Sequence, residues 1–228
     1  MKQIFTKSLS VVALASAILP FTTHADVIIS EVNPTGSSAS YGADWFELKN
    51  TGTSAVDITG WKMDDNSSAF ASAVSLRGIT SIAPGLTVVF LEGNTTGTTD
   101  ATIDANFASA WFGGSVPAGL TLANYGGSGV GLSGTADAVN IYDSAGTLMA
   151  SVSFGVATAG VSFDNAAGLN NTAISQLSVA GVNGAFLSFN GLETGSPGDV
   201  APVPEPTTLA LAGVGLAGLW SFRRRHRK

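Results

Sequence analysis

The sequence predicts an all-β, sandwich-like domain between two terminal segments of different character. Three observations predict it: a low content of charged residues with many Gly, Ser, Thr, Ala and Val, short apolar runs at sandwich-like spacing, and no stretch with a convincing amphipathic-helix period. A domain of about 175 residues can bury roughly 70% of its unfolded surface. Because the chain has no cysteine, such a domain must be stabilised by its core rather than by disulfides.

Three segments carry the first half of this domain. Residues 27–32 form a first strand that ends at an Asn-Pro turn pair. In residues 44–50 apolar and charged side chains alternate, which is typical of a half-buried strand. The apolar run 86–91 follows a Pro-Gly turn, so we expect a central strand buried on both sides.

A bend is expected at Gly60. Val56 and Ile58 would lie on one face of a strand, whereas Trp61 and Met63 have the opposite parity. A glycine between two such pairs indicates a bulge or a bend.

The second half is expected to contain a hairpin and a last strand. Residues 139–141 and 148–154 alternate in polarity around the turn 143–146, where Gly146 suits a positive φ. Residues 185–189 are the expected last strand, with Phe186 and Leu187 competing for the core.

Residues 93–134 are rich in Gly, Thr and Ser, and we expect a loop-like insertion that packs back on the domain. The aromatic residues Trp111, Phe112 and Tyr125 lie within it.

The N-terminus has the features of a secretory signal peptide. Lys2 and Lys7 give a positive start, residues 11–19 are apolar, and residues 23–25 form a small-residue cleavage site. We expect cleavage between Ala25 and Asp26, by signal peptidase. The alternative is a retained N-terminal helix.

The C-terminus combines a proline-rich motif, an uncharged apolar run at 207–222 and a basic end. This order resembles the PEP-CTERM sorting signal of Gram-negative bacteria, which implies processing by an exosortase at an inner-membrane intermediate. The run reaches only about 24 Å as a helix, short of a comfortable membrane span, and the basic end is expected to stay cytoplasmic. An ordinary tail anchor is the alternative. The motif is Val203, Pro204, Glu205 and Pro206, and the basic anchor is Arg223, Arg224, Arg225, Arg227 and Lys228.

These terminal segments divide the chain into residues 1–25, a domain at 26–200, and a sorting segment at 201–228. Residues 26–203 contain 15 acidic residues and the basic residues Lys49, Lys62 and Arg77, so the formal charge there is 3 − 15 = −12. Since binding to nucleic acid depends on neutralising phosphates with basic side chains, this charge disfavours nucleic-acid partners.

Several motifs of the domain resemble the lamin tail domain. The resemblance rests on Ile-Ser-Glu-Val at 29–32, Asp-Trp-Phe-Glu-Leu-Lys-Asn at 44–50, Val-Asp-Ile-Thr-Gly-Trp at 56–61 and a closing Ser-Pro-Gly at 196–198. It implies an immunoglobulin-like β-sandwich, a fold that hosts many functions and determines none.

The motif residues are expected to be mainly structural. We expect the two tryptophans to be core or sheet-face aromatics, and Glu47 to be solvated or paired across strands. A second possibility for Glu47 is that it holds the turn 50–52. The motif residues are Glu31, Trp45, Glu47, Asn50, Gly60 and Trp61.

Few residue types for catalysis are present between the terminal segments. The two histidines, His24 and His226, lie in those segments, and cysteine is absent; this excludes Cys-His, Ser-His-Asp and His-based zinc systems from the domain. A pair of carboxylates, as in glycosidases, stays open. So does calcium, for which Asp64, Asp65, Asp100 and Asp104 are weak candidate ligands.

Three functions therefore compete. The leading one is an exported, exosortase-sorted, non-enzymatic envelope or extracellular-matrix protein with a structural, adhesive or binding role and no cofactor, whose partners could be extracellular polysaccharide or a surface protein. The second is a calcium- or glycan-binding module that presents Trp111, Phe112 and Tyr125 on its surface. The third is a carboxylate-dependent hydrolase.

Overall fold

The computed structural model describes residues 27–93, 97–126, 129–165 and 170–198. The predicted signal peptide and sorting segment lie outside these residues. The elements are β1 (Val27–Asn33), a 3-10 helix η1 (Gly36–Ser38), β2 (Trp45–Asn50), β3 (Val56–Asp57), β4 (Lys62–Asp64), β5 (Val74–Arg77), β6 (Ser81–Ile82), β7 (Thr87–Glu92), α1 (Asp100–Phe112), β8 (Leu120–Tyr125), β9 (Asp137–Tyr142), β10 (Leu148–Phe154), β11 (Phe163–Asp164), β12 (Ala173–Ile174), β13 (Phe186–Leu187) and β14 (Thr194–Gly195).

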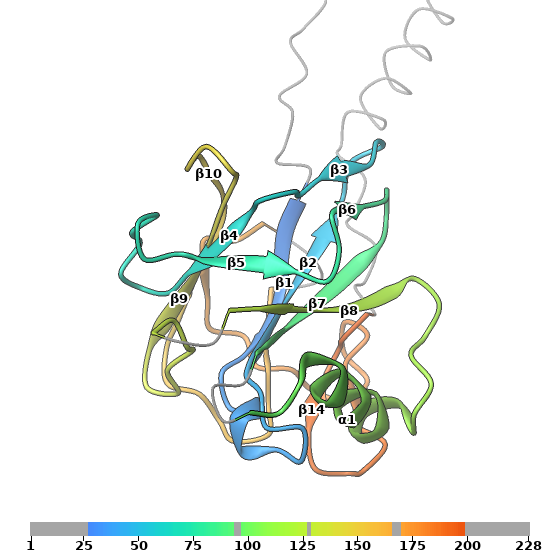
Figure 1. Cartoon of the computed structure of the whole chain (residues 1–228). Coiled ribbons are helices and arrows are strands. Elements are labelled where there is room, and N and C mark those ends of the chain that lie inside the picture. Colours follow the sequence, from blue (N-terminus) through green and yellow to red (C-terminus); the bar gives the residue numbers. More distant parts are fainter. Residues whose placement is uncertain (1–26, 94–96, 127–128, 166–169, 199–228) are drawn as a thin grey trace, which may run out of the picture.

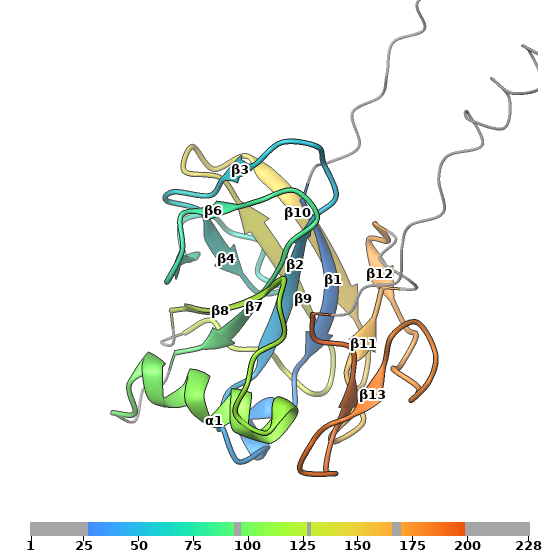
Figure 2. The ribbon, with the colours of Figure 1, turned by 90° about the vertical axis from the view of Figure 1, so that its right-hand side faces the viewer.

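The strands form an immunoglobulin-like β-sandwich. Ten of them follow each other in the order β11-β1-β2-β7-β8-β5-β4-β9-β10-β12, and the pairs β13–β14 and β3–β6 are separate. This long sheet bends so that β1 lies against β10 (Figures 1 and 2). Most neighbours are antiparallel, but the pairs β7–β8 and β10–β12 are parallel. The chain between β7 and β8 must therefore cross back over the sheet.

The main core fills the space between the two halves of the bent sheet. Phe46 and Leu48 of β2 contribute to it from one half, and Val139 and Ile141 of β9 from the other. Trp61 also belongs to this core, with 5% of its surface exposed. The expectation that Trp61 is a core residue is therefore confirmed.

A second apolar cluster covers the opposite face of β2 and β7. Val88 and Phe90 of β7 face the main core, whereas Val89 and Leu91 face this second cluster. The strand is therefore buried on both faces, as its apolar run predicts. Trp45 of β2 lies in the second cluster and is fully buried.

The segment 93–134 is not the loop that we expect from its composition, because it contains α1 and β8. Helix α1 carries the crossover between the parallel strands. Thr99 caps its first turn by accepting a hydrogen bond from the Thr102 N–H, and Gly113 ends it in the left-handed conformation. Ile103, Phe107 and Trp111 then lie on one helical face and pack into the second cluster.

The other turns follow the sequence closely. Gly60 has a φ of 75° between β3 and β4, and Gly146 a φ of 89° between β9 and β10. The last expected strand is shorter than predicted, since only Phe186 and Leu187 pair. Phe186 packs edge-on against Trp111, while Leu187 is exposed.

Candidate functional site: a buried carboxylate pair under the closing turn

Two motif glutamates lie side by side beneath the C-terminal end of the domain. Glu31 of β1 lies opposite Glu47 of β2 in the antiparallel pair. The pairing register between the two strands shifts between Ile29 and Glu31. Their exposed fractions are 1% and 0%. Since buried carboxylates require hydrogen-bond partners, their surroundings define what the pair can do.

Glu31 is held from two distant parts of the chain. Its Oε1 accepts hydrogen bonds from the Ser162 hydroxyl and from the backbone N–H of Ser196 at 2.8 Å, and its Oε2 accepts one from the Ser196 hydroxyl at 3.1 Å. Ser162 in turn shares a hydrogen bond of 2.8 Å with Ser178.

Glu47 completes the attachment of the closing turn. Its Oε1 accepts a hydrogen bond of 2.6 Å from the Ser30 hydroxyl, and its Oε2 accepts one of 2.5 Å from the backbone N–H of Gly198. Both glutamates thus bind the Ser-Pro-Gly segment 196–198 at the C-terminal end of the domain.

The environment favours the protonated forms of both carboxyls. Burial raises the pKa of Glu31 well above its usual range, and repulsion from Glu47 raises that pKa further. Burial also raises the pKa of Glu47 to about 7, against the opposing effect of the hydrogen bonds from Ser30 and Gly198. Glu47 can therefore keep a proton near neutral pH.

The backbone of Gly195 closes this site sterically. A Cβ atom at residue 195 would lie 2.6 Å from Glu31 Oε1, 2.8 Å from Ser162 Oγ and 3.0 Å from Trp111. The chain therefore passes directly over the Glu31 carboxylate at a point where only glycine fits.

Glu47 is paired across strands, through the hydrogen bond from Ser30 of β1, but it is neither solvated nor attached to the turn 50–52. Asn50 holds that turn instead. Its Oδ1 accepts a hydrogen bond of 2.9 Å from the Gly52 N–H, and its Nδ2 donates to the carbonyls of Ser54 and Ile82 at 2.8 Å each. An Asx turn of this kind was visible in the sequence as Asn-Thr-Gly.

Sequence reasoning missed a second buried polar network, centred on Glu193. Its Oε1 accepts hydrogen bonds from the Tyr41 hydroxyl at 2.6 Å and from Asn33 Nδ2 at 3.3 Å. Trp45 Nε1 donates to the Tyr41 hydroxyl at 3.1 Å. Trp45 is therefore both a packing residue and a hydrogen-bond donor, and the network fixes the β14 end to β1 and β2.

The aromatic surface expected in segment 93–134 is not present. Trp111 and Tyr125 are 1% and 0% exposed, and only Phe112 is partly exposed. These side chains belong to the two cores, so they cannot present a platform to a glycan.

The four candidate calcium ligands lie in two separate places, each with internal partners. Asp64 accepts hydrogen bonds from the Ser67 and Ser72 hydroxyls and the Ala69 N–H, and Asp65 accepts one from the Ser67 N–H.

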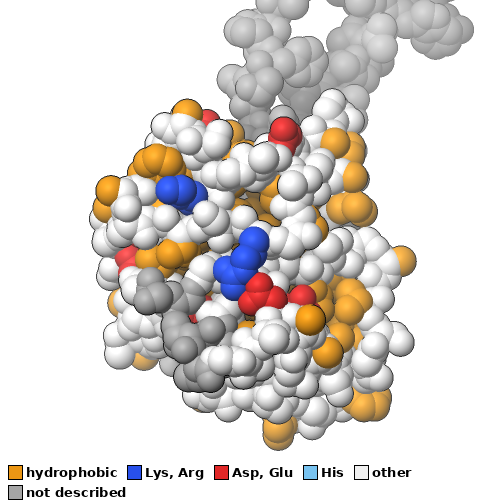
Figure 3. Space-filling model, viewed as in Figure 1, with side chains coloured by type: hydrophobic (Ala, Val, Ile, Leu, Met, Phe, Trp, Pro, Cys, Tyr) orange, Lys and Arg blue, Asp and Glu red, His pale blue; other side chains and the backbone are white. Residues whose placement is uncertain are grey.

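On α1, Asp100 forms a two-bond ion pair with Arg77, at 2.6 and 2.8 Å, and Asp104 accepts from Asn124. Basic and acidic side chains meet on the face shown in Figure 3. Within the described ranges no group of three or more acidic, His or Cys side chains could hold a metal ion.

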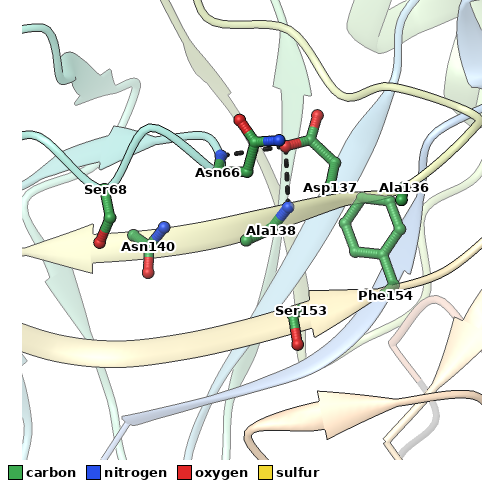
Figure 4. Close-up of a pocket in the computed structure, with 8 residues that line it drawn as sticks. All are labelled: Asn66, Ser68, Ala136, Asp137, Ala138, Asn140, Ser153 and Phe154. Carbon is green, nitrogen blue, oxygen red and sulfur yellow. Dashed lines mark hydrogen bonds between the residues drawn. The ribbon is translucent and has the colours of Figure 1, made fainter.

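A shallow hollow lies at the edge of β9 and β10 (Figure 4). Its volume is about 430 Å³. Asp137 lies at one side, and its carboxylate accepts hydrogen bonds from the backbone N–H groups of Asn66, Ala138 and Ser133. The lining residues are Asn66, Ser68, Ala136, Asp137, Ala138, Asn140, Ser153 and Phe154.

Helices long and apolar enough to cross a membrane do not occur in the part of the chain that the structure describes. The predicted sorting helix at 207–222 lies outside that part.

Comparisons with known proteins agree with both sequence resemblances. A model of the PEP-CTERM protein-sorting motif matches residues 202–225. This match marks an exported protein that is recognised by exosortase, processed at the membrane and passed to the cell surface. No curated protein matches the chain. A model of the Lamin Tail Domain matches residues 20–155, more than half of the 228 residues, and the chain therefore belongs to the lamin tail domain family.

Proposed function

We propose that this chain is a non-enzymatic envelope or extracellular-matrix protein, with a structural or adhesive role, whose β-sandwich is displayed after exosortase processing. One observation carries the proposal: the two motif carboxylates that lie as a buried pair are used to hold the closing turn. Every Glu31 and Glu47 oxygen receives a hydrogen bond from the chain itself.

The position of that turn supports a display role. Gly198 is the last described residue, and the matched sorting motif begins at residue 202. The sorting motif therefore begins four residues after Gly198, whose backbone N–H is hydrogen-bonded to Glu47. A domain attached in this way carries its whole folded surface up to the membrane, which suits presentation rather than turnover of a diffusing substrate.

The first test follows the sorting segment. The full chain is expressed in a Gram-negative host that contains an exosortase, and its surface form is weighed by intact-mass analysis. We expect a mature protein that begins at Asp26 and lacks the basic end from Arg223 to Lys228. Changing Pro204, Glu205 and Pro206 to alanine should leave a longer, membrane-retained species. A surface form that still carries Lys228 would contradict the proposal.

The second test addresses the role at the surface. Cells without the gene are complemented with the wild-type chain or with the alanine variant of residues 204–206, and attachment and envelope integrity are measured. We expect only the wild-type chain to restore them. Unchanged attachment and integrity in cells without the gene would argue against a structural or adhesive role.

Binding of a neutral glycan is a second candidate, favoured by the amide and hydroxyl lining of the hollow in Figure 4. Titration calorimetry with neutral oligosaccharides tests it, using Asn66→Ala because Asn66 is exposed and its loss should not unfold the domain. We propose no resident metal, so calcium and a chelator should give the same melting temperature.

A further inference from the structure

The surface of residues 179–192 is unusually apolar for this domain. Ten large hydrophobic side chains are exposed in the described part of the chain, and half of them fall in this segment. Phe189 and Leu192 are the most prominent, with exposed fractions of 75% and 74%. The five residues, called the hairpin patch below, are Val179, Val182, Leu187, Phe189 and Leu192.

The hairpin patch is held in place by the fold. Between β13 and β14, the Ser188 N–H donates to the Glu193 carbonyl, and the Gly191 N–H donates to the Ser188 carbonyl, both at 2.8 Å. The N–H groups of Phe189 and Asn190 donate to carbonyls of α1, at 3.1 and 3.0 Å. Figure 2 shows β13 and its turn at the lower edge of the domain, beside the end of α1. The exposed side chains therefore stand on a fixed backbone.

This surface differs from the rest of the domain in its lack of charged residues. Residues 165–192 contain no charged residue, although residues 26–203 have a formal charge of −12. Like charges brought together across an interface are strongly unfavourable. Two copies of this acidic chain can therefore approach most easily through a surface without charge.

We propose that the hairpin patch is an interface through which two copies of this chain associate at the envelope. Five exposed side chains from one short segment make a contact smaller than the roughly 800 Å² per partner of a stable complex.

The association is therefore weak in dilute solution. All copies carry the same sorting segment within a few residues of Gly198, so they are delivered to the same cell surface. Confinement of this kind raises the effective concentration towards the millimolar range, which makes a weak contact sufficient.

The absence of cysteine from the sequence allows a direct test in the full chain. Leu192→Cys places a single thiol in the hairpin patch, and Val156→Cys places one at a site that is equally exposed, at 75%. Cells that display either variant are treated with a short bifunctional maleimide. We expect covalent dimers from Leu192→Cys at least tenfold more often than from Val156→Cys.

A second pair of variants tests the apolar contact itself. Leu187→Ser with Phe189→Ser, added to Leu192→Cys, should reduce the dimer at least tenfold. Leu148→Ser with Met149→Ser, two exposed residues at the start of β10, should leave it unchanged. Unaltered melting temperatures show that the domains are folded.

Three results would overturn the proposal. Equal dimer formation at residues 156 and 192 would show random proximity on the membrane. Retention of the dimer after Leu187→Ser with Phe189→Ser would place the contact elsewhere. Binding of the wild-type domain to zwitterionic lipid vesicles, together with no dimer from Leu192→Cys, would assign the hairpin patch to a bilayer.

Discussion

The carboxylate pair makes the stability of the domain depend on pH in an unusual direction. The pKa of Glu47 in the folded state is about 7, against 4.5 for the free side chain. Between these values the folded protein keeps a proton that the unfolded chain has released. The contribution of Glu47 to stability is therefore fully present below about pH 4.5 and is lost as the pH rises through 7. The pKa of Glu31 is raised too, so its contribution has the same sign.

The magnitude follows from the size of the shift. A change from 4.5 to about 7 corresponds to a loss of about 3 kcal/mol of unfolding free energy across this range. Glu47→Gln removes the titration but keeps the shape. At low pH the folded wild-type carboxyl is protonated and, like the amide, has one carbonyl oxygen and one donating group, so the two side chains should stabilise the domain to within about 1 kcal/mol of each other there.

We therefore expect the two stability curves to separate as the pH rises. Glu47→Gln should be about as stable as the wild type at pH 4.5 and more stable than it at pH 8, as measured by urea unfolding with tryptophan fluorescence. Asp57→Asn is the control, since Asp57 is exposed and hydrogen bonds from Thr59 lower its pKa, so it does not titrate between pH 5 and 7. Parallel curves for the wild type and Glu47→Gln would refute the reasoning.

Three further predictions concern the core and the sheet. Trp61→Ala and Trp111→Ala should each cost about 3 to 5 kcal/mol in urea unfolding, because both rings are buried; a small loss at Trp111 would mean that α1 is not docked. Gly195→Ala should destabilise by about 1 to 3 kcal/mol, since its Cβ would lie 2.6 Å from Glu31, and a neutral effect would show that the closing turn can move away. Arg77→Ala should cost less than about 1 kcal/mol, since its ion pair with Asp100 is 38% exposed on both sides; a larger loss would show that this pair orders α1.

Apolar runs and the alternation of side chains along the sequence predicted several strands and bends correctly. The apolar run of β7 indicates burial on both faces, and the parity change at Gly60 indicates the bend between β3 and β4. Helix α1 was not predicted because alanines at 101 and 105 make its exposed face weakly apolar and obscure the helical period. The spacing of Ile103, Phe107 and Trp111 was the available signal, and it would have placed Trp111 in a core.

The burial of Glu31 and Glu47 could not follow from local pattern, because the groups that satisfy them are far away in the chain. Ser196 is 165 residues from Glu31, and Gly198 is 151 residues from Glu47. On a strand beside Lys49, a glutamate has the spacing of a solvated residue until the closing turn covers it. The sequence nevertheless contained both halves of the contact, as family motifs at opposite ends of the domain. In the folded domain, Glu31 accepts a hydrogen bond from the Ser196 N–H, and Glu47 accepts one from the Gly198 N–H. These contacts attach the end of the sandwich to its first two strands.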